Sequence, residues 1–102
     1  MNDTELYMQA VAQWGAEAQL LMVCEEVAEL TVALHHYLRG RGDMGDIAEE
    51  VADVEFMLDQ LKAIFDLADA PRSDFSALVQ EWRTTKRMKL EAMLNLPKEA
   101  RQ

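Results

Sequence analysis

Residues 16–38 read AEAQLLMVCEEVAELTVALHHYL, and the pattern of this segment indicates a helical protein. Apolar side chains recur through it at helical spacing. One apolar stripe consists of Leu20, Val23, Val27, Leu30 and Leu34, and Leu21, Ala28 and Val32 line the opposite flank. Between Ala18 and Leu38 the only formal charges are Glu25, Glu26 and Glu29, which share one arc of the helix. A charged arc on an otherwise apolar helix indicates either a solvated strip or a functional site.

Helical periodicity extends over most of the chain, and glycine and proline fall between the periodic segments. No strand pattern competes, so we predict an all-α fold, a four-helix bundle. The predicted helices run from about Asp3 to Trp14, Ala16 to Leu38, Asp46 to Ala68 and Ser73 to Leu94. Residues 39–45 form a flexible turn, and Ser73 is the expected N-cap of the last helix.

The length of 102 residues suits one domain, which we assign to residues 1–102. The two long helices are apolar on more sides than one small chain can cover. We therefore expect homodimerisation to complete the core, with a dimer of dimers, a homotetramer, as a further possibility.

Charge and cysteine content narrow the function classes. The net charge is −9, with 19 acidic against 10 basic residues, which argues against nucleic-acid binding because phosphate backbones select positive surfaces. The single cysteine, Cys24, cannot form an internal disulfide, and the first residues are polar and acidic, unlike a signal peptide. We therefore expect a cytoplasmic protein. Glutamates interrupt the most apolar stretch, so membrane insertion is not expected.

A second acidic pair lies on the third predicted helix. Its apolar stripe consists of Ile47, Val51, Val54, Leu58, Leu61 and Phe65. Glu50 and Asp53 border the interior, and antiparallel pairing brings them opposite Glu26 and Glu29. Four carboxylates in a partly dry site repel one another unless a cation is present. Oxygen-only ligands favour Mg²⁺, with Mn²⁺ as a substitute, over Zn²⁺.

These acids also carry a family resemblance. Residues 25–29 read EEVAE, an EExxE pattern, and residues 50–53 read EVAD, an ExxD pattern. Both motifs, their spacing and the surrounding Trp14-Gly15, Gln19-Leu20 and Arg39-Gly40 pairs resemble MazG-like nucleotide pyrophosphohydrolases. The resemblance covers roughly residues 10–95 and is greatest to the compact, single-domain type carried by phages and mobile elements.

The resemblance implies an enzyme that hydrolyses a nucleoside triphosphate between its α- and β-phosphates, giving the monophosphate and pyrophosphate, as in nucleotide-pool house-cleaning. It implies that Glu26, Glu29, Glu50 and Asp53 bind Mg²⁺. Glu25 would bind a further metal or orient the attacking water, which completes the expected catalytic set. The preferred base is not indicated.

Five residues are candidates for substrate contacts. Lys86 and Lys89 fall on the apolar side of the last helix, where basic residues are unusual, and family members carry a phosphate-binding base near this point. Long lysine stems also cover apolar neighbours without any such role. Trp14 and Tyr37 offer stacking surfaces for a base, and the amide of Gln19 suits a base edge. The alternative for Trp14 is a core or interface position.

Two other classes of function compete. A di-iron carboxylate bundle is disfavoured because its usual Glu-x-x-His pairs are missing. A non-enzymatic acidic interaction module, or an antitoxin-like protein, requires that the four acids be individually replaceable.

Overall fold

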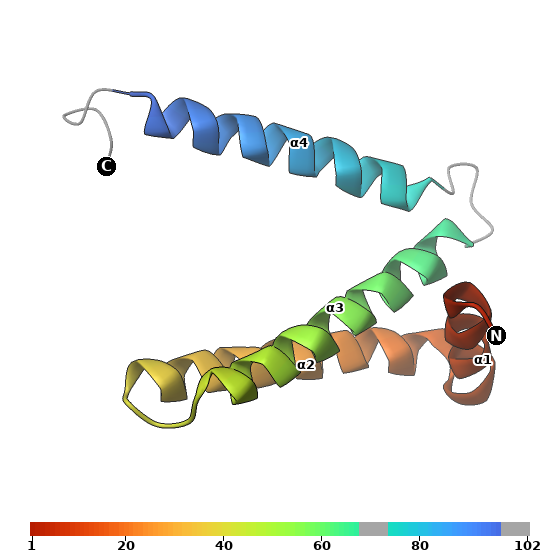
Figure 1. The fold of residues 1–102 in the computed structure, drawn as a ribbon. Helices are drawn as coiled ribbons and strands as arrows, with labels where there is room; N and C mark the ends of the chain where they lie inside the picture. The colour runs from red at the N-terminus through yellow and green to blue at the C-terminus, as the bar shows by residue number, and fades with distance from the viewer. Residues whose placement is uncertain (68–73, 97–102) are drawn as a thin grey trace.

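The computed structural model describes residues 1–67 and 74–96, and within these ranges the chain forms four helices and no strand. They are α1 (Asp3–Trp14), α2 (Ala16–Leu38), α3 (Met44–Asp66) and α4 (Phe75–Leu94). Helices α2 and α3 pair as an antiparallel hairpin, and α1 packs against both near one end (Figure 1). The all-α, four-helix prediction is therefore confirmed.

Local capping explains where the helices begin. The Asn2 side chain accepts a hydrogen bond from the Glu5 N–H at 2.8 Å, and the Glu5 carboxylate accepts one from the Asn2 N–H, so α1 begins at Asp3 as predicted. Asp43 and Asp46 form the same reciprocal box at the start of α3. Because Asp43 is the N-cap, α3 begins at Met44, two residues before the predicted start at Asp46.

The junction of α3 and α4 uses a cap that comes from the preceding helix. The Asp66 carboxylate accepts hydrogen bonds from the Ser76 N–H at 2.8 Å and from the Ser76 hydroxyl at 2.5 Å. The rings of Phe65 and Phe75 stack beside it, with centroids 4.9 Å apart. Helix α3 ends at Asp66 and α4 begins at Phe75, and the predicted boundary residues Ala68 and Ser73 lie outside the described residues.

The core of this chain is small and partly polar. Its buried apolar side chains, among the residues described, are Tyr7, Val23 and Met57, and the buried polar ones are Gln19 and Gln60. Tyr7 meets Phe56 edge to face at 5.4 Å, which fastens α1 to α3.

The predicted apolar stripes are less buried than their periodicity indicates. Val27 is 44% exposed on α2, and Leu58 and Phe65 are 39% and 41% exposed on α3. The reason is that the two helices pair through the α2–α3 seam, which shares Val23 with the predicted α2 stripe but also carries Met57, glutamines and carboxylates. The exposed side chains of these stripes are therefore available for contact with another surface.

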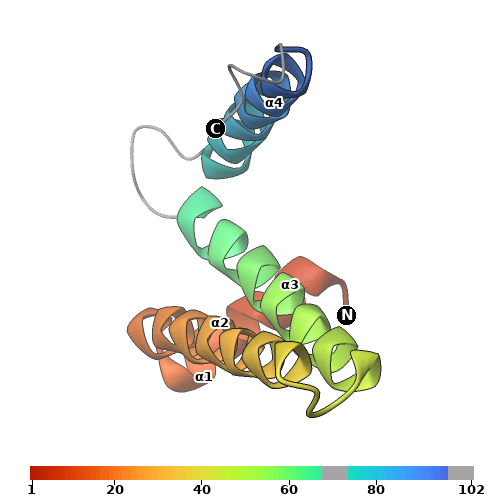
Figure 2. The ribbon, with the colours of Figure 1, turned by 90° about the vertical axis from the view of Figure 1, so that its left-hand side faces the viewer.

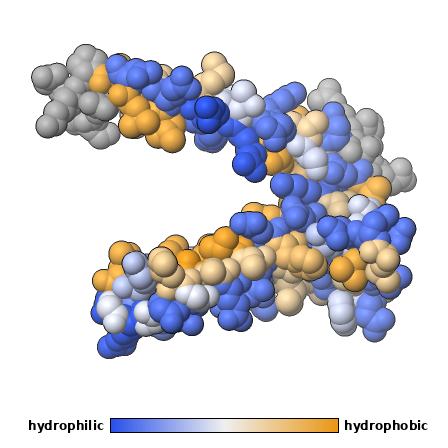
Figure 3. Space-filling view, in the orientation of Figure 1, coloured by the Kyte–Doolittle hydropathy of each residue, from blue (hydrophilic) through white to orange (hydrophobic). Residues whose placement is uncertain are grey.

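Helix α4 forms a separate arm (Figures 1 and 2). It packs on the end of α3 and has no buried side chain. In the space-filling view, apolar surface lines both the hairpin and the side of α4 turned toward it (Figure 3). The radius of gyration is 17.6 Å, against about 13 Å for a compact domain of this length. No helix in the described part of the chain is long and apolar enough to span a membrane.

Candidate metal centre

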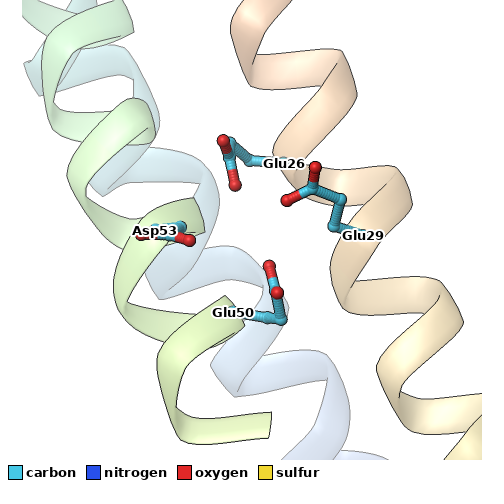
Figure 4. Close-up of side chains that lie close together, drawn as sticks. All are labelled: Glu26, Glu29, Glu50 and Asp53. Carbon is cyan, nitrogen blue, oxygen red and sulfur yellow. The ribbon is translucent and has the colours of Figure 1, made fainter. Parts of the chain in front are cut away.

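Two pairs of carboxylates meet across the α2–α3 seam. Glu26 and Glu29 lie one turn apart on α2, and Glu50 and Asp53 lie one turn apart on α3. The antiparallel pairing turns both pairs toward a common centre between the helices (Figure 4). We call these four residues the acidic cluster. The predicted convergence is therefore present in the structure.

The dimensions of the acidic cluster suit a small cation. One carboxylate oxygen from each residue can be chosen so that all four lie within 4.8 Å of one another. Opposite ligands of an octahedral Mg²⁺ are about 4.2 Å apart, twice the usual Mg–O distance. The cluster contains no histidine or cysteine, so its donor set fits Mg²⁺ or Mn²⁺ better than Zn²⁺.

Two of the carboxylate oxygens are buried without a partner. Oε2 of Glu26 and Oε2 of Glu50 are shielded from solvent and accept no hydrogen bond. Burial raises the pKa of both carboxyl groups above the ordinary value for glutamate, and the negative charges of Glu29 and Asp53 raise it further. An unpartnered buried carboxylate is unfavourable, and a bound cation removes the penalty directly.

Basic side chains in the described part of the chain do not provide this compensation. Within residues 1–67 and 74–96 the only ion pair joins Lys62 to Asp59 at 3.9 Å, and it does not involve the acidic cluster. Among the described residues, therefore, no lysine or arginine forms an ion pair with the acidic cluster.

Glu25 does not join the acidic cluster. It is exposed on α2, beside Glu26 in sequence but turned about 100° around the helix. Its expected role, binding a further metal or orienting water, stays a prediction.

Cavities flank the acidic cluster on both sides along the seam. Toward the α2–α3 turn, a cavity of about 380 Å³ is lined by Glu29 and Glu50 together with His36 and Asp46. Toward α1, a cavity of about 610 Å³ is lined by Trp14, Gln19, Phe56 and Gln60, among others. We call these the turn cavity and the α1 cavity.

The α1 cavity contains two of the predicted base contacts and one residue that the sequence analysis missed. Gln60 Nε2 donates a hydrogen bond to Gln19 Oε1 at 2.9 Å. Gln60 lies seven residues after Asp53, and Gln19 lies seven residues before Glu26, so both amides occupy the seam two turns from the acidic cluster. This matched seven-residue spacing is the sequence signal by which Gln60 could have been predicted as the partner of Gln19. Tyr37, 47% exposed near the end of α2, lines neither cavity.

The predicted phosphate contacts lie elsewhere in this chain. Lys86 and Lys89 are exposed on α4, and α4 makes no contact with α2. The Lys86 ammonium lies over the Trp82 ring, 5.8 Å from its centroid, in a groove formed by α4 itself. The structure therefore does not bring either lysine to the acidic cluster of its own chain.

Comparison with known proteins identifies no relative: no family model matches the sequence, and no curated protein or solved structure matches the chain.

Proposed function

We propose that this chain is a Mg²⁺-dependent nucleotide pyrophosphohydrolase that converts nucleoside triphosphates to the monophosphate and pyrophosphate. The proposal combines the EExxE and ExxD resemblance to MazG-like enzymes with the geometry of the acidic cluster. Removal of unwanted nucleotides in the cytoplasm is the role that such an activity serves.

One observation carries the proposal: the unpartnered buried oxygens of Glu26 and Glu50 belong to a cluster in the α2–α3 seam that also contains the carboxylates of Glu29 and Asp53. A structural acid at a helix interface normally finds a hydrogen-bond partner. Four acids that share one space, two of them with a buried unpartnered oxygen, are instead typical of a site that binds a hard cation.

The residues have separate roles in this proposal. The acidic cluster holds Mg²⁺, which neutralises phosphate charge and lowers the pKa of bound water when it is present. Glu29 and Glu50 also line the turn cavity, so phosphate groups that reach the cluster have adjoining space. Glu25 lies next to the cluster in sequence and is proposed to orient the attacking water from its rim.

The α1 cavity is the proposed place of the nucleobase. Its amides and the acidic cluster are separated by two helical turns, about 10.5 Å along the axis. This separation suits a nucleotide whose phosphates lie at the cluster. Trp14, 64% exposed at the rim, offers a stacking face, while the Gln19 and Gln60 amides offer donors and acceptors. Tyr37 would contact substrate only if another subunit brought substrate to it.

We also propose that the chain functions as a homodimer or a larger homo-oligomer. Three features support this proposal: the extended shape of the chain, the absence of buried side chains on α4 and the exposed apolar stripes. A single chain leaves large apolar side chains in water on every helix.

The proposal is tested by incubating purified protein with a panel of ribo- and deoxyribonucleoside triphosphates and Mg²⁺, and measuring pyrophosphate. We expect pyrophosphate with at least one nucleotide, and none after chelation of the metal. Glu50→Gln should abolish the activity, whereas Glu49→Gln, an exposed neighbour outside the cluster, should retain it.

The proposed enzymatic function is contradicted if no nucleotide yields pyrophosphate and Glu50→Gln binds Mg²⁺ as the wild type does. Those two results together favour a non-enzymatic interaction module or an antitoxin-like protein, because they would show that an acid of the cluster can be replaced without loss of function.

A further inference from the structure

We infer that the Gln19–Gln60 amide pair reads the nucleobase in either of two directions, so that the chain hydrolyses an amino-base nucleotide and its oxo-base counterpart about equally well. The inference rests on the proposed function, because it concerns the base of the nucleotide whose phosphates lie at the acidic cluster. It adds the class of substrate, which is set by the base edges that the pair accepts.

The α1 cavity differs from the turn cavity in charge. The residues that line the α1 cavity are three aromatic, four glutamine and three apolar aliphatic ones, and none carries a formal charge. The turn cavity is lined by Glu29, Asp46 and Glu50. A neutral heterocycle therefore fits the α1 cavity better than a charged group does, and its recognition has to use neutral hydrogen bonds.

Gln19 and Gln60 are the buried polar residues of this cavity. They are 8% and 3% exposed, whereas the other two glutamines of the lining, Gln9 and Gln13, are exposed. Gln60 donates to Gln19, and among the residues that the structure describes neither side-chain amide has a second hydrogen bond. Nothing else in this part of the chain therefore fixes which of the two amides donates.

The pair leaves one donor and one acceptor for a ligand. The hydrogen bond uses the Gln19 oxygen and the Gln60 nitrogen, so Gln19 Nε2 and Gln60 Oε1 are left over. In the described ranges the unpartnered side-chain atoms that are fully buried belong to Glu26 and Glu50, so the two left-over amide atoms keep access to solvent. Because both glutamines line the α1 cavity, a base in that cavity has one donor and one acceptor beside it.

A half-turn of both amides exchanges these two roles. An amide oxygen and an amide NH₂ group are of similar size, so the turn keeps the packing and reverses the hydrogen bond. Gln19 then donates to Gln60, which leaves the Gln19 oxygen as the acceptor and the Gln60 nitrogen as the donor. The pair offers one donor and one acceptor in both states, at exchanged positions.

The same exchange distinguishes an amino base from its oxo counterpart. Cytosine has an amino donor beside the ring acceptor N3, whereas uracil has the O4 acceptor beside the N3–H donor. Adenine and hypoxanthine differ in the same way. One direction of the amide pair matches the amino base and the other matches the oxo base. A nucleotide and its deamination product are therefore both substrates.

Steady-state kinetics with matched substrates test this inference. We measure kcat/KM for dCTP against dUTP and for dATP against dITP, because the members of each pair differ in the amino-to-oxo exchange alone. For a pair that is hydrolysed, the two values should agree within about fivefold. Amides fixed in one direction would separate them by roughly 5- to 150-fold, from the usual worth of a bidentate base contact. Such a separation overturns the inference and leaves the proposed function intact.

A variant shows whether the amides contact the base at all. Gln60→Met removes one amide at nearly constant length, and the remaining Gln19 amide can still turn. KM should therefore rise for both members of a pair by a similar factor, roughly tenfold. Gln80→Met, at an exposed position on α4 outside the α1 cavity, is the control and should keep both KM values. A rise for one member alone, or for neither, overturns the inference.

The direction of the amide hydrogen bond is also measurable without catalysis. Wild-type protein labelled with ¹³C and ¹⁵N is mixed with Mg²⁺ and a monophosphate product, and NMR coupling across the hydrogen bond identifies the donating Nε2. We expect one glutamine to donate with dCMP or dAMP and the other to donate with dUMP or dIMP.

The same donor in both complexes, or amide resonances that respond to no monophosphate, overturn the inference and leave the pair as a structural contact. If the donor changes but no triphosphate is hydrolysed, the two-way reading of the base is retained and the proposed function fails.

Discussion

Gln60 donates a hydrogen bond from Nε2 to Oε1 of Gln19 at 2.9 Å, and the two side chains are 3% and 8% exposed. The amides form a polar layer in the α2–α3 seam, between the α1 end and the apolar layer of Val23 and Met57. A buried polar pair of this kind penalises other registers, because a shift of one helix leaves both amides unsatisfied. The same register sets the acidic cluster two turns away.

The first prediction concerns this amide pair. Gln60→Leu leaves the Gln19 amide buried without its partner and should lower the free energy of unfolding by roughly 1–3 kcal/mol. Changing both residues to leucine should cost less than the single change, since no buried amide is then left unpaired. Urea unfolding at one fixed protein concentration measures both values. Additive losses in the double variant would mean that the two amides do not act as a pair.

The second prediction is that Mg²⁺ reverses the order of stability of the wild type and Glu50→Gln. Without divalent metal, Glu50→Gln should be more stable than the wild type, because it removes one of four repelling charges and a buried unpartnered carboxylate oxygen. With Mg²⁺ present the order should invert, since binding to the folded state stabilises it by about 2.7 kcal/mol at a concentration 100 times the Kd. Thermal unfolding with and without Mg²⁺ measures both effects.

Glu49→Gln is the control for this reversal, because Glu49 adjoins Glu50 in sequence, is exposed and lies outside the acidic cluster. It should keep the full response to Mg²⁺. An equal loss of response in both variants would point to diffuse surface charge instead of a defined site.

The sequence predicts the helices of this chain well, because each boundary depends on local signals. Helices α1 and α2 have their predicted bounds, and α3 differs at its start because Asp43, not a later residue, provides the cap. The four acids of the cluster were also predictable, since their i, i+3 spacing fixes a common face on each helix.

The faces by which helices meet are harder to predict. Periodicity indicates that α2 is apolar on most sides, and it does not show which side faces α3. Of the predicted α2 stripe, Val23 is buried in the seam beside Gln19, whereas Val27 and Leu34 stay exposed. The position of α4 depends on contacts between Asp66 and Ser76 that no periodic pattern contains.

The third prediction concerns pH at the α3–α4 junction. Hydrogen bonds from the Ser76 hydroxyl and N–H lower the pKa of Asp66 below the ordinary value for aspartate. Because the folded-state pKa is lowered, the stabilising effect is fully present above the ordinary aspartate pKa and is lost as the pH falls through the lowered one. The Ser76 amide resonance in NMR spectra should therefore move with the ionisation of Asp66, with a midpoint below that of a model aspartate.

Asp66→Asn should abolish that titration and weaken the docking of α4, and hydrogen exchange along Phe75–Leu94 should report the weakening. A Ser76 amide that titrates unchanged in this variant would show that another group is responsible.

The fourth prediction uses the two tryptophans of the chain, Trp14 and Trp82, as separate reporters. In Trp82→Phe the only indole left is Trp14, at the rim of the α1 cavity. A hydrolysable nucleotide's monophosphate product should quench its fluorescence, because a base stacks on the ring, while tripolyphosphate, which has no base, should leave it nearly unchanged. Trp14→Ala should raise KM for that nucleotide by roughly tenfold, since base stacking is worth about 1–3 kcal/mol, and should change kcat much less. Quenching by tripolyphosphate to the same extent, or a fall in kcat without a rise in KM, would place the base outside the α1 cavity and return Trp14 to a structural role.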